Sequence, residues 1–405
     1  MTNLTLLAGS GALSVAPLNE SPGYTRPEGA LRSRVAYAAA HVVPKTWADN
    51  TPGQPAEVDW DATLGFRRAV YSWGLGVADA MDTAQRNMGL DAAATRELIA
   101  RSAGVAREEG GSVVVGVNTD HVEDEHITIA QVIDAYTQQL HFTEEQGAGP
   151  VLMASRHLAR TAGSAGDYRR VYREVLQAAT TPVVLHWLGT AFDPSLEGYF
   201  GSTDWREASA VLLEIIAENT DKIAGVKMSL LDAASEVSVR ERLPDGVRMF
   251  TGDDFNYVGL IGGQDVPDAT QPDRDPASSR QHSDALLGAF AAITPVASAA
   301  IQALDAGDPA RYLEILGPTE QLSRQVFAAP TFYYKTGVAF LSWLNGHQDA
   351  FQMVGGLHSA RSLPHLSRIV ELANSSLSLE QPELAAIRWH GMLRHNGLDV
   401  PGVIA

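Results

Sequence analysis

Residues 224–231 read Ala224-Gly225-Val226-Lys227-Met228-Ser229-Leu230-Leu231 and place a lone lysine at the end of an apolar run. A short apolar run of this kind is typical of a strand in a buried parallel sheet. Burial favours the neutral form of a lysine because desolvation lowers its pKa, and the neutral amine can attack a ketone. Lys227 is therefore a candidate nucleophile. The alternative is a strand-end lysine that reaches solvent and has no chemical role.

On both sides of this lysine, short β-branched or apolar runs alternate with longer stretches of helical period. This alternation is typical of βα units around a parallel sheet, and eight units close a (β/α)8 TIM barrel. The expected strands lie at 34–43, 75–78, 112–117, 150–153, 182–187, 223–227, 247–251 and, more weakly, 285–290. Helices are expected between them at 60–73, 91–107, 128–146, 167–179 and 205–219.

Three regions follow from this pattern: an N-terminal extension at 1–33, the barrel at 34–294 and a C-terminal helical region at 295–405. A TIM barrel uses about 250 residues, so the remaining residues must be additions. Two insertions rich in turn-forming residues are expected near 44–58 and 264–283. The C-terminal helices are expected at 295–306, 309–326, 331–344, 366–375 and 382–395.

The composition excludes several classes of function. The chain has 405 residues and a formal net charge of -18, which argues against nucleic acid or an anionic membrane as a partner. It contains no cysteine, so disulfides and thiolate chemistry are excluded. No stretch has the length of a membrane span, and residues 1–20 lack the pattern of a signal peptide. We expect a cytoplasmic protein that acts on a small molecule.

Polar residues follow the expected strands at the edge where a TIM barrel carries its active site. Each one alone could be a solvated loop residue or a helix cap, but their convergence favours a site. The set comprises His41, Asp79, Asp82, Thr83, Asn118, Asp120, Arg156, His157, His186, Lys227, Gly252, Asp253 and Asp254.

Three segments and the C-terminal helices resemble the Schiff-base aldolases typified by dihydrodipicolinate synthase and N-acetylneuraminate lyase. Gly225-Val226-Lys227 resembles the G-[IV]-K motif whose lysine forms an imine with a 2-oxo acid. The segment Pro182-Val183-Val184-Leu185-His186-Trp187 resembles P-x-x-L-Y-N, and Thr251-Gly252-Asp253-Asp254 resembles the S-G-x-D turn. The resemblance implies a TIM barrel with a helical appendage, a lyase that needs no cofactor or metal, and a homo-oligomer.

The sequence departs from this family at three places. His186 replaces the proton-relay tyrosine and could act as a general acid and base with a pKa near neutrality. Asp82-Thr83-Ala84-Gln85-Arg86 replaces the carboxylate-binding G-T-T-G-E, and an aspartate there repels a substrate carboxylate. Ser155, Arg156 and His157 stand where a tyrosine pair is expected.

The resemblance implies a 2-oxo acid as the substrate, and these departures favour a neutral or sugar-derived carbonyl compound, so imine chemistry on either class is expected. Retro-aldol cleavage, aldol addition or β-elimination would each follow from a lysine imine. The catalytic candidates are Lys227, His186 and Thr83, and the substrate-binding candidates are Asp82, Arg156, Gly252, Asp254, His41 and Asn118.

Two other functions stay open on the same fold. A metal-dependent sugar isomerase or epimerase would use carboxylates and histidines, and the run from His121 to His126 contains several, although it also suits a solvated acidic helix start. A ligand-binding barrel without catalysis would fit the loss of the relay tyrosine. The aromatic residues of 332–343 have helical spacing and are expected to pack the appendage on the barrel or at a subunit interface.

Overall fold

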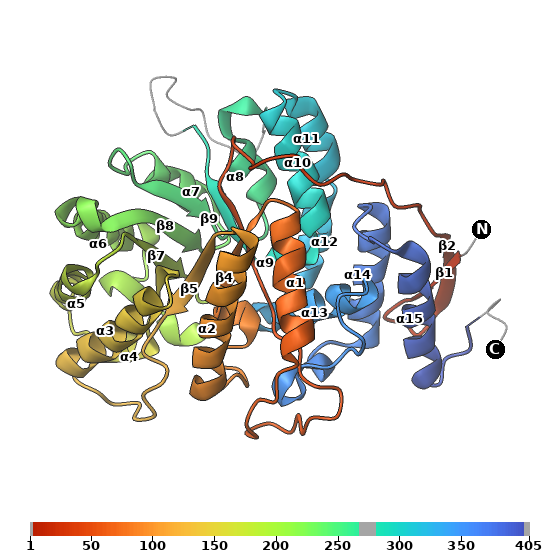
Figure 1. Cartoon of the computed structure of the whole chain (residues 1–405), viewed down its shortest axis with the longest axis horizontal. Helices are drawn as coiled ribbons and strands as arrows, with labels where there is room; N and C mark the ends of the chain where they lie inside the picture. Colours follow the sequence, from red (N-terminus) through yellow and green to blue (C-terminus); the bar gives the residue numbers. More distant parts are fainter. Residues whose placement is uncertain (1–2, 267–280, 401–405) are drawn as a thin grey trace.

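A closed barrel of eight parallel strands forms the centre of the computed structural model, which describes residues 3–266 and 281–400 (Figure 1). Around the barrel the strand order is β10-β3-β4-β5-β6-β7-β8-β9. The fold is therefore the expected TIM barrel. The strands are β3 (Ala36–Ala39), β4 (Gly76–Asp79), β5 (Val113–Val117), β6 (Gly149–Met153), β7 (Val183–Leu188), β8 (Ile223–Ser229), β9 (Arg248–Thr251) and β10 (Asp284–Leu287).

The register between strands places Lys227 in the barrel interior. Lys227 pairs with His186 on β7 and with Phe250 on β9, and His186 pairs with Met153 on β6. Paired residues on neighbouring strands point to the same face of a sheet. Met153 and Phe250 belong to the apolar cluster that fills the barrel. Lys227 and His186 therefore occupy an interior layer near the carboxyl ends of the strands.

Amphipathic helices cover the outside of the barrel, and most begin at an aspartate or threonine that caps the first turn. Asp59, Asp91, Thr128, Asp204 and Asp232 each accept a hydrogen bond from a backbone N–H of their own helix. The helices are α1 (Trp60–Ser72), α2 (Ala92–Glu109), α3 (Ile129–Glu145), α4 (Arg156–Thr161), α5 (Ala165–Ala178), α6 (Trp205–Glu218), α7 (Ala233–Arg240) and α8 (Tyr257–Gly262).

From the eighth strand onwards, the structure differs from the expectation at two points. The expected strand 285–290 stops at Leu287, and the apolar run continues as the short helix α9 (Gly288–Ala292). The single helix expected at 309–326 is two helices, because Pro318 has no backbone N–H with which to continue the first. The helices are α10 (Thr294–Asp305), α11 (Pro309–Leu316), α12 (Thr319–Val326), α13 (Tyr334–Leu344), α14 (Leu363–Ser375) and α15 (Pro382–His395).

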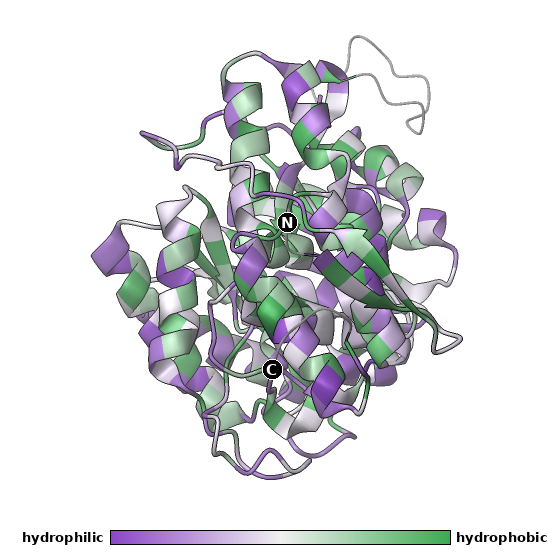
Figure 2. Cartoon of the chain, turned by 90° about the vertical axis from the view of Figure 1, so that its right-hand side faces the viewer, coloured by the Kyte–Doolittle hydropathy of each residue, from purple (hydrophilic) through white to green (hydrophobic). Residues whose placement is uncertain are grey.

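A β-hairpin near the N-terminus lies against the C-terminal helices, and the sequence pattern does not predict it. Strands β1 (Asn3–Leu7) and β2 (Leu13–Pro17) pair in an antiparallel sheet beside α14 and α15 (Figures 1 and 2). The indole N–H of Trp389 donates to the carbonyl of Thr5 at 2.7 Å, and the backbone N–H of Thr5 donates to His390 at 3.0 Å. These buried contacts fix the hairpin to the last helix.

The two expected insertions have different outcomes. An antiparallel bridge between Pro44 and Val58 closes the base of the first. Most of the second, at 264–283, lies outside the described residues.

In the described residues, no helix combines the length and the apolar character needed to cross a bilayer.

Asp79 is an outward-facing structural residue at the end of β4. Its carboxylate accepts two hydrogen bonds from Arg67 on α1, at 2.9 and 2.8 Å, and both side chains are 0% exposed. The same carboxylate accepts bonds from the Ser102 hydroxyl and the Ala80 backbone N–H. Asp79 therefore ties α1 and α2 to the barrel and takes no place among the interior polar residues.

Candidate active site

The Lys227 side chain extends into the barrel beneath the loop that follows β9. The residue is 8% exposed. A Cβ added at Gly252 would lie 2.7 Å from Lys227 Cε and would also collide with the Ser229 hydroxyl. Gly252 therefore leaves room for the lysine.

Two aspartates share the surroundings of the Lys227 amine. Burial lowers the pKa of Lys227 to about 8, and the negative charges of Asp254 and Asp82 oppose that shift. Burial likewise raises the pKa of Asp254 to about 7, against a hydrogen bond from the Ala289 backbone N–H at 2.9 Å. A sizeable fraction of the Lys227 amine is therefore neutral near pH 8, as a nucleophile requires.

His186 lies beside Lys227 and its properties differ from those expected. Its Nε2 is 3.1 Å from the Ser229 hydroxyl, and its Nδ1 has no partner within the part of the chain that the structure describes. Burial and the positive charge of Lys227 lower its pKa well below the usual value. The imidazole is therefore neutral at pH 7, which corrects the expectation of a pKa near neutrality.

Thr83 has a partner that the sequence did not identify. Thr83 lies in a 3-10 turn (Asp82–Ala84) after β4, and its hydroxyl is 2.7 Å from the hydroxyl of Tyr334, the first residue of α13. The Tyr334 ring stacks on Phe327 with 4.4 Å between ring centroids. Burial, chiefly, and the charge of Asp82 raise the Tyr334 pKa well above its usual value, so this phenol stays protonated. The aromatic segment expected to serve packing thus also reaches the site.

Lys335, the next residue of α13, is a second buried lysine near Asp82. Burial lowers the pKa of Lys335 to about 8, and the charge of Asp82 opposes the shift. Sequence spacing gives no indication that these residues meet, because about 250 positions separate them. The C-terminal region therefore contributes side chains to the barrel mouth as well as packing.

An open cleft of about 370 Å³ lies over the carboxyl ends of β4 to β7. Three of the expected substrate-binding residues line it: Asp82, Asn118 and Arg156. The Arg156 guanidinium pairs with Asp193 at 2.6 Å and is 43% exposed. Asp82, which lines this cleft, is also one of the charges that act on the pKa of Lys227.

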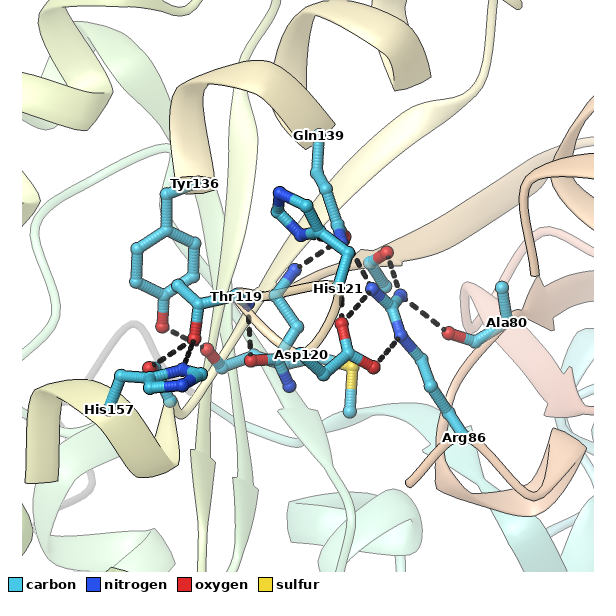
Figure 3. Close-up of polar contacts among 12 residues, drawn as sticks. Ala80, Arg86, Thr119, Asp120, His121, Tyr136, Gln139 and His157 are labelled. Carbon is cyan, nitrogen blue, oxygen red and sulfur yellow. Dashed lines mark hydrogen bonds and ion pairs between the residues drawn. The ribbon is translucent and has the colours of Figure 1, made fainter. Parts of the chain in front are cut away.

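Two polar clusters support one wall of this cleft (Figure 3). In one cluster, the Arg86 guanidinium pairs with the Asp120 carboxylate at 2.7 Å and also donates to the side-chain oxygen of Gln139. The side-chain nitrogen of Gln139 is in turn 2.7 Å from His121 Nδ1. In the other, the Thr119 hydroxyl is 2.8 Å from His157 Nδ1. The side chains of Asp120 and His121 are therefore committed to neighbouring protein groups.

The remaining candidates are placed differently. His41 is buried between Phe66 and Gln348, with its Nε2 2.8 Å from the Gln348 side-chain oxygen, and we leave it out of the proposed site. Asp253 turns its carboxylate back to the N–H groups of Phe255 and Asn256 and so caps its own turn. Across the described ranges, 3–266 and 281–400, no three His, Asp or Glu side chains are grouped to hold a metal ion.

The fold is that of dihydrodipicolinate synthase. The structure of that enzyme from Aquifex aeolicus is 15% identical in sequence, with a TM-score of 0.57 over 91% of this chain and 100% of the other. The enzyme from Oceanobacillus iheyensis is 12% identical, with a TM-score of 0.60 over 84% and 96% of the two chains. The enzyme from Bacteroides thetaiotaomicron is 14% identical, with a TM-score of 0.59 over 83% and 98%.

Residues 4–398 match the family model DUF993, described as a protein of unknown function, and the chain belongs to this family. No curated protein matches the sequence. At this level of identity the solved structures establish the shared fold, and the chemistry has to be argued from the residues of the site.

Proposed function

We propose that the protein is a class I lyase or aldolase that forms an imine between Lys227 and the carbonyl group of a small substrate. The observation that carries this proposal is a buried lysine at the carboxyl end of β8 whose pKa is lowered to about 8. A TIM barrel places its catalytic groups at these strand ends. Trapping the imine by borohydride reduction tests the proposal.

In the proposed reaction, the neutral Lys227 amine attacks the carbonyl carbon, and the new C–N bond gives a carbinolamine. Proton transfer to the carbinolamine oxygen releases water and leaves a protonated imine, which withdraws electrons from the adjacent carbon. In C–C cleavage, a substrate hydroxyl loses its proton as the bond to that adjacent carbon breaks, and the resulting enamine is protonated at carbon to give an imine. In β-elimination, the adjacent carbon instead loses a proton, and the β-hydroxyl takes up a proton and leaves as water. Hydrolysis of the imine regenerates Lys227.

We assign the proton transfers to the hydroxyl pair of Thr83 and Tyr334. The two oxygens are 2.7 Å apart and buried, so a proton can pass along them without bulk water. Neutral His186 supplies a hydrogen-bonding position at Nδ1 for a substrate hydroxyl. Asp254, with a pKa raised to about 7 by burial, can exchange a proton near neutral pH.

The rate of imine formation is expected to rise with pH and to level off near pH 8. Below the Lys227 pKa of about 8, each pH unit increases the neutral amine about tenfold, and above it nearly all of the amine is neutral. Aliquots reduced with borohydride at successive times and analysed by intact mass give the rate at each pH. A rate that still climbs at pH 10 would show an unperturbed lysine and contradict the assignment.

Tyr334→Phe is expected to slow imine formation by about 100-fold, since a positioned proton donor contributes roughly that factor. The change removes the hydroxyl bonded to Thr83 and keeps the ring stacked on Phe327. Tyr333→Phe is the matched control, because it removes a hydroxyl one position away. Equal rates of imine formation in the two variants would show that the Tyr334 hydroxyl takes no part in the proton transfer.

The alternatives have less support. The carboxylates and histidines of 121–126 include side chains bonded to Gln139 and to the chain's own backbone, so no observation favours a metal-dependent isomerase. A binding barrel without catalysis would form no imine, and trapping separates it from the proposal. Assembly into a homo-oligomer and a location in the cytoplasm remain predictions.

A further inference from the structure

A buried hydroxyl of the cleft donates to an imidazole that is held in one orientation. Thr119 follows β5 and is 1% exposed, and its hydroxyl oxygen is 2.8 Å from His157 Nδ1 (Figure 3). His157 Nε2 is 3.0 Å from the backbone carbonyl of Asp124. A carbonyl only accepts hydrogen bonds, so Nε2 carries the ring hydrogen, and Nδ1 of the neutral ring accepts from Thr119. This is the arrangement of a hydroxyl, a base and a group that orients the base.

The Thr119 oxygen has room for one more hydrogen bond. The Ser155 hydroxyl is 2.6 Å from it, and Ser155 is the donor because the Thr119 hydrogen points to His157. A hydroxyl oxygen accepts two hydrogen bonds, so one acceptor position stays open with respect to the described residues. Ser155 also caps α4 by accepting from the Leu158 backbone N–H at 3.1 Å. Capping accounts for Ser155 but for neither Thr119 nor His157.

The register of the barrel places this pair within reach of a substrate held by Lys227. Thr119, His157 and Met153 all line the cleft of about 370 Å³. Met153 pairs with His186, and His186 pairs with Lys227 on the next strand. Neighbouring strands are about 4.8 Å apart, so β6 lies roughly 10 Å from the strand of the lysine. The lysine side chain and a substrate of several carbons together cover this distance.

We propose that Thr119 takes the proton from the substrate hydroxyl during C–C cleavage and that His157 holds this charge until the fragment leaves. The inference rests on the proposed function. The substrate O–H bond breaks as its proton passes to the Thr119 oxygen, and the hydrogen of Thr119 passes to His157 Nδ1. The electrons of the O–H bond form the carbonyl of the leaving fragment, and those of the C–C bond move to the imine. His157 then returns the proton through Thr119 to water.

The hydroxyl pair of Thr83 and Tyr334 lacks this capacity. Burial raises the pKa of Tyr334 well above its usual value, so the two neutral hydroxyls pass protons along but hold no additional one. Asp254 acts on the amine of the reactive lysine. An imidazole is the side chain that most often takes up and returns a proton in catalysis. Thr119 and His157 therefore add a proton acceptor on the side of the barrel where the cleft lies.

The experiment separates imine formation from C–C cleavage within one assay. Diacetone alcohol and fructose each have six carbons and a hydroxyl β to the carbonyl, so cleavage replaces a six-carbon adduct on Lys227 with a three-carbon adduct. Intact mass after borohydride reduction follows both adducts over time. In Thr119→Val and in His157→Asn, the six-carbon adduct is expected to form at the wild-type rate and the three-carbon adduct about 100-fold more slowly.

Two features of the variants distinguish proton uptake from packing. Asparagine at position 157 keeps an acceptor near the position of Nδ1, but its amide takes up no proton, so cleavage at the wild-type rate would show that a structural contact is sufficient. Thr143→Val is the matched control for Thr119→Val. Thr143 is a buried residue of α3 whose hydroxyl has no partner among the described residues, and its variant should cleave as wild type does.

The possible outcomes separate this inference from the imine itself. Cleavage at the wild-type rate in Thr119→Val or His157→Asn overturns the assignment and leaves the imine standing. An equal loss of both adducts, or an equally slow cleavage in Thr143→Val, also overturns it. A wild type that forms only six-carbon adducts overturns it as well, because no hydroxyl proton is then removed. Absence of any adduct in wild type rejects the proposed function, and this inference falls with it. Circular dichroism spectra verify that each variant is folded.

Discussion

Lys227→Ala is expected to abolish the borohydride-trapped adduct and to lower turnover by at least about 1000-fold. Loss of a covalent nucleophile removes the pathway that it opens, and only binding and polar stabilisation of the transition state remain. The measurement is intact mass after borohydride reduction with a panel of carbonyl compounds: pyruvate, hydroxypyruvate, hydroxyacetone and keto-sugars. The mass added to wild type also identifies which compound reacts.

Lys227→Arg is the sharper companion to this variant. Arginine keeps a long cationic side chain beside Asp254 and Asp82, but its guanidinium stays protonated and forms no imine. If Lys227 acts only through its charge, the arginine variant retains activity and the alanine variant does not. If Lys227 is the nucleophile, both variants lose the adduct. Full activity in either variant would refute the imine mechanism.

The sequence was sufficient to predict the barrel because its strands are buried on both faces and therefore appear as continuous apolar runs. Val113–Val117 is such a strand, and all five of its residues are buried. The same rule fails at β10, where the apolar run continues past Leu287 into the buried helix α9. Periodicity cannot separate a buried strand from a buried helix over so few residues.

The hairpin escaped prediction for the opposite reason. Strand β2 is largely exposed, so it carries little apolar alternation. Its partner β1 is held by Trp389 and His390, more than 380 residues away in the chain. Contacts over such a separation leave no local pattern in the sequence.

The sequence predicts only those residues of the candidate site that lie at the end of a strand. Lys227, His186 and Asp254 follow from their places after β-branched runs, and the structure gathers them at one end of the barrel. Tyr334 and Lys335 could not be found in this way, because they come from a helix that folds back over Asp82 and Thr83. The pKa of His186 depends on the depth of its burial, which residue type alone does not give.

Asp79→Ala is expected to lower the free energy of unfolding by about 3–5 kcal/mol, the cost of leaving one member of a buried ion pair without its partner. The Arg67 guanidinium is 0% exposed and would keep its bonds to the carbonyls of His41 and Thr63 but lose its only carboxylate among the described residues. Urea unfolding followed by circular dichroism measures the loss. Glu97→Ala, which breaks the exposed pair with Arg101, is the control and should cost less than about 1 kcal/mol.

The double variant Arg67→Met/Asp79→Leu distinguishes the ion pair from other roles of Asp79. Replacing both charges with apolar groups leaves no buried charge unpaired, so it should cost less than Asp79→Ala. Asp79 also accepts the backbone N–H of Ala80 at 2.7 Å and so holds a residue with a φ of 47°. This positive φ turns the chain towards Asp82 and Thr83. If the double variant regains stability but still forms the adduct slowly, Asp79 positions the site through this turn. If the double variant recovers both stability and the rate of adduct formation, the only role of Asp79 is in the ion pair.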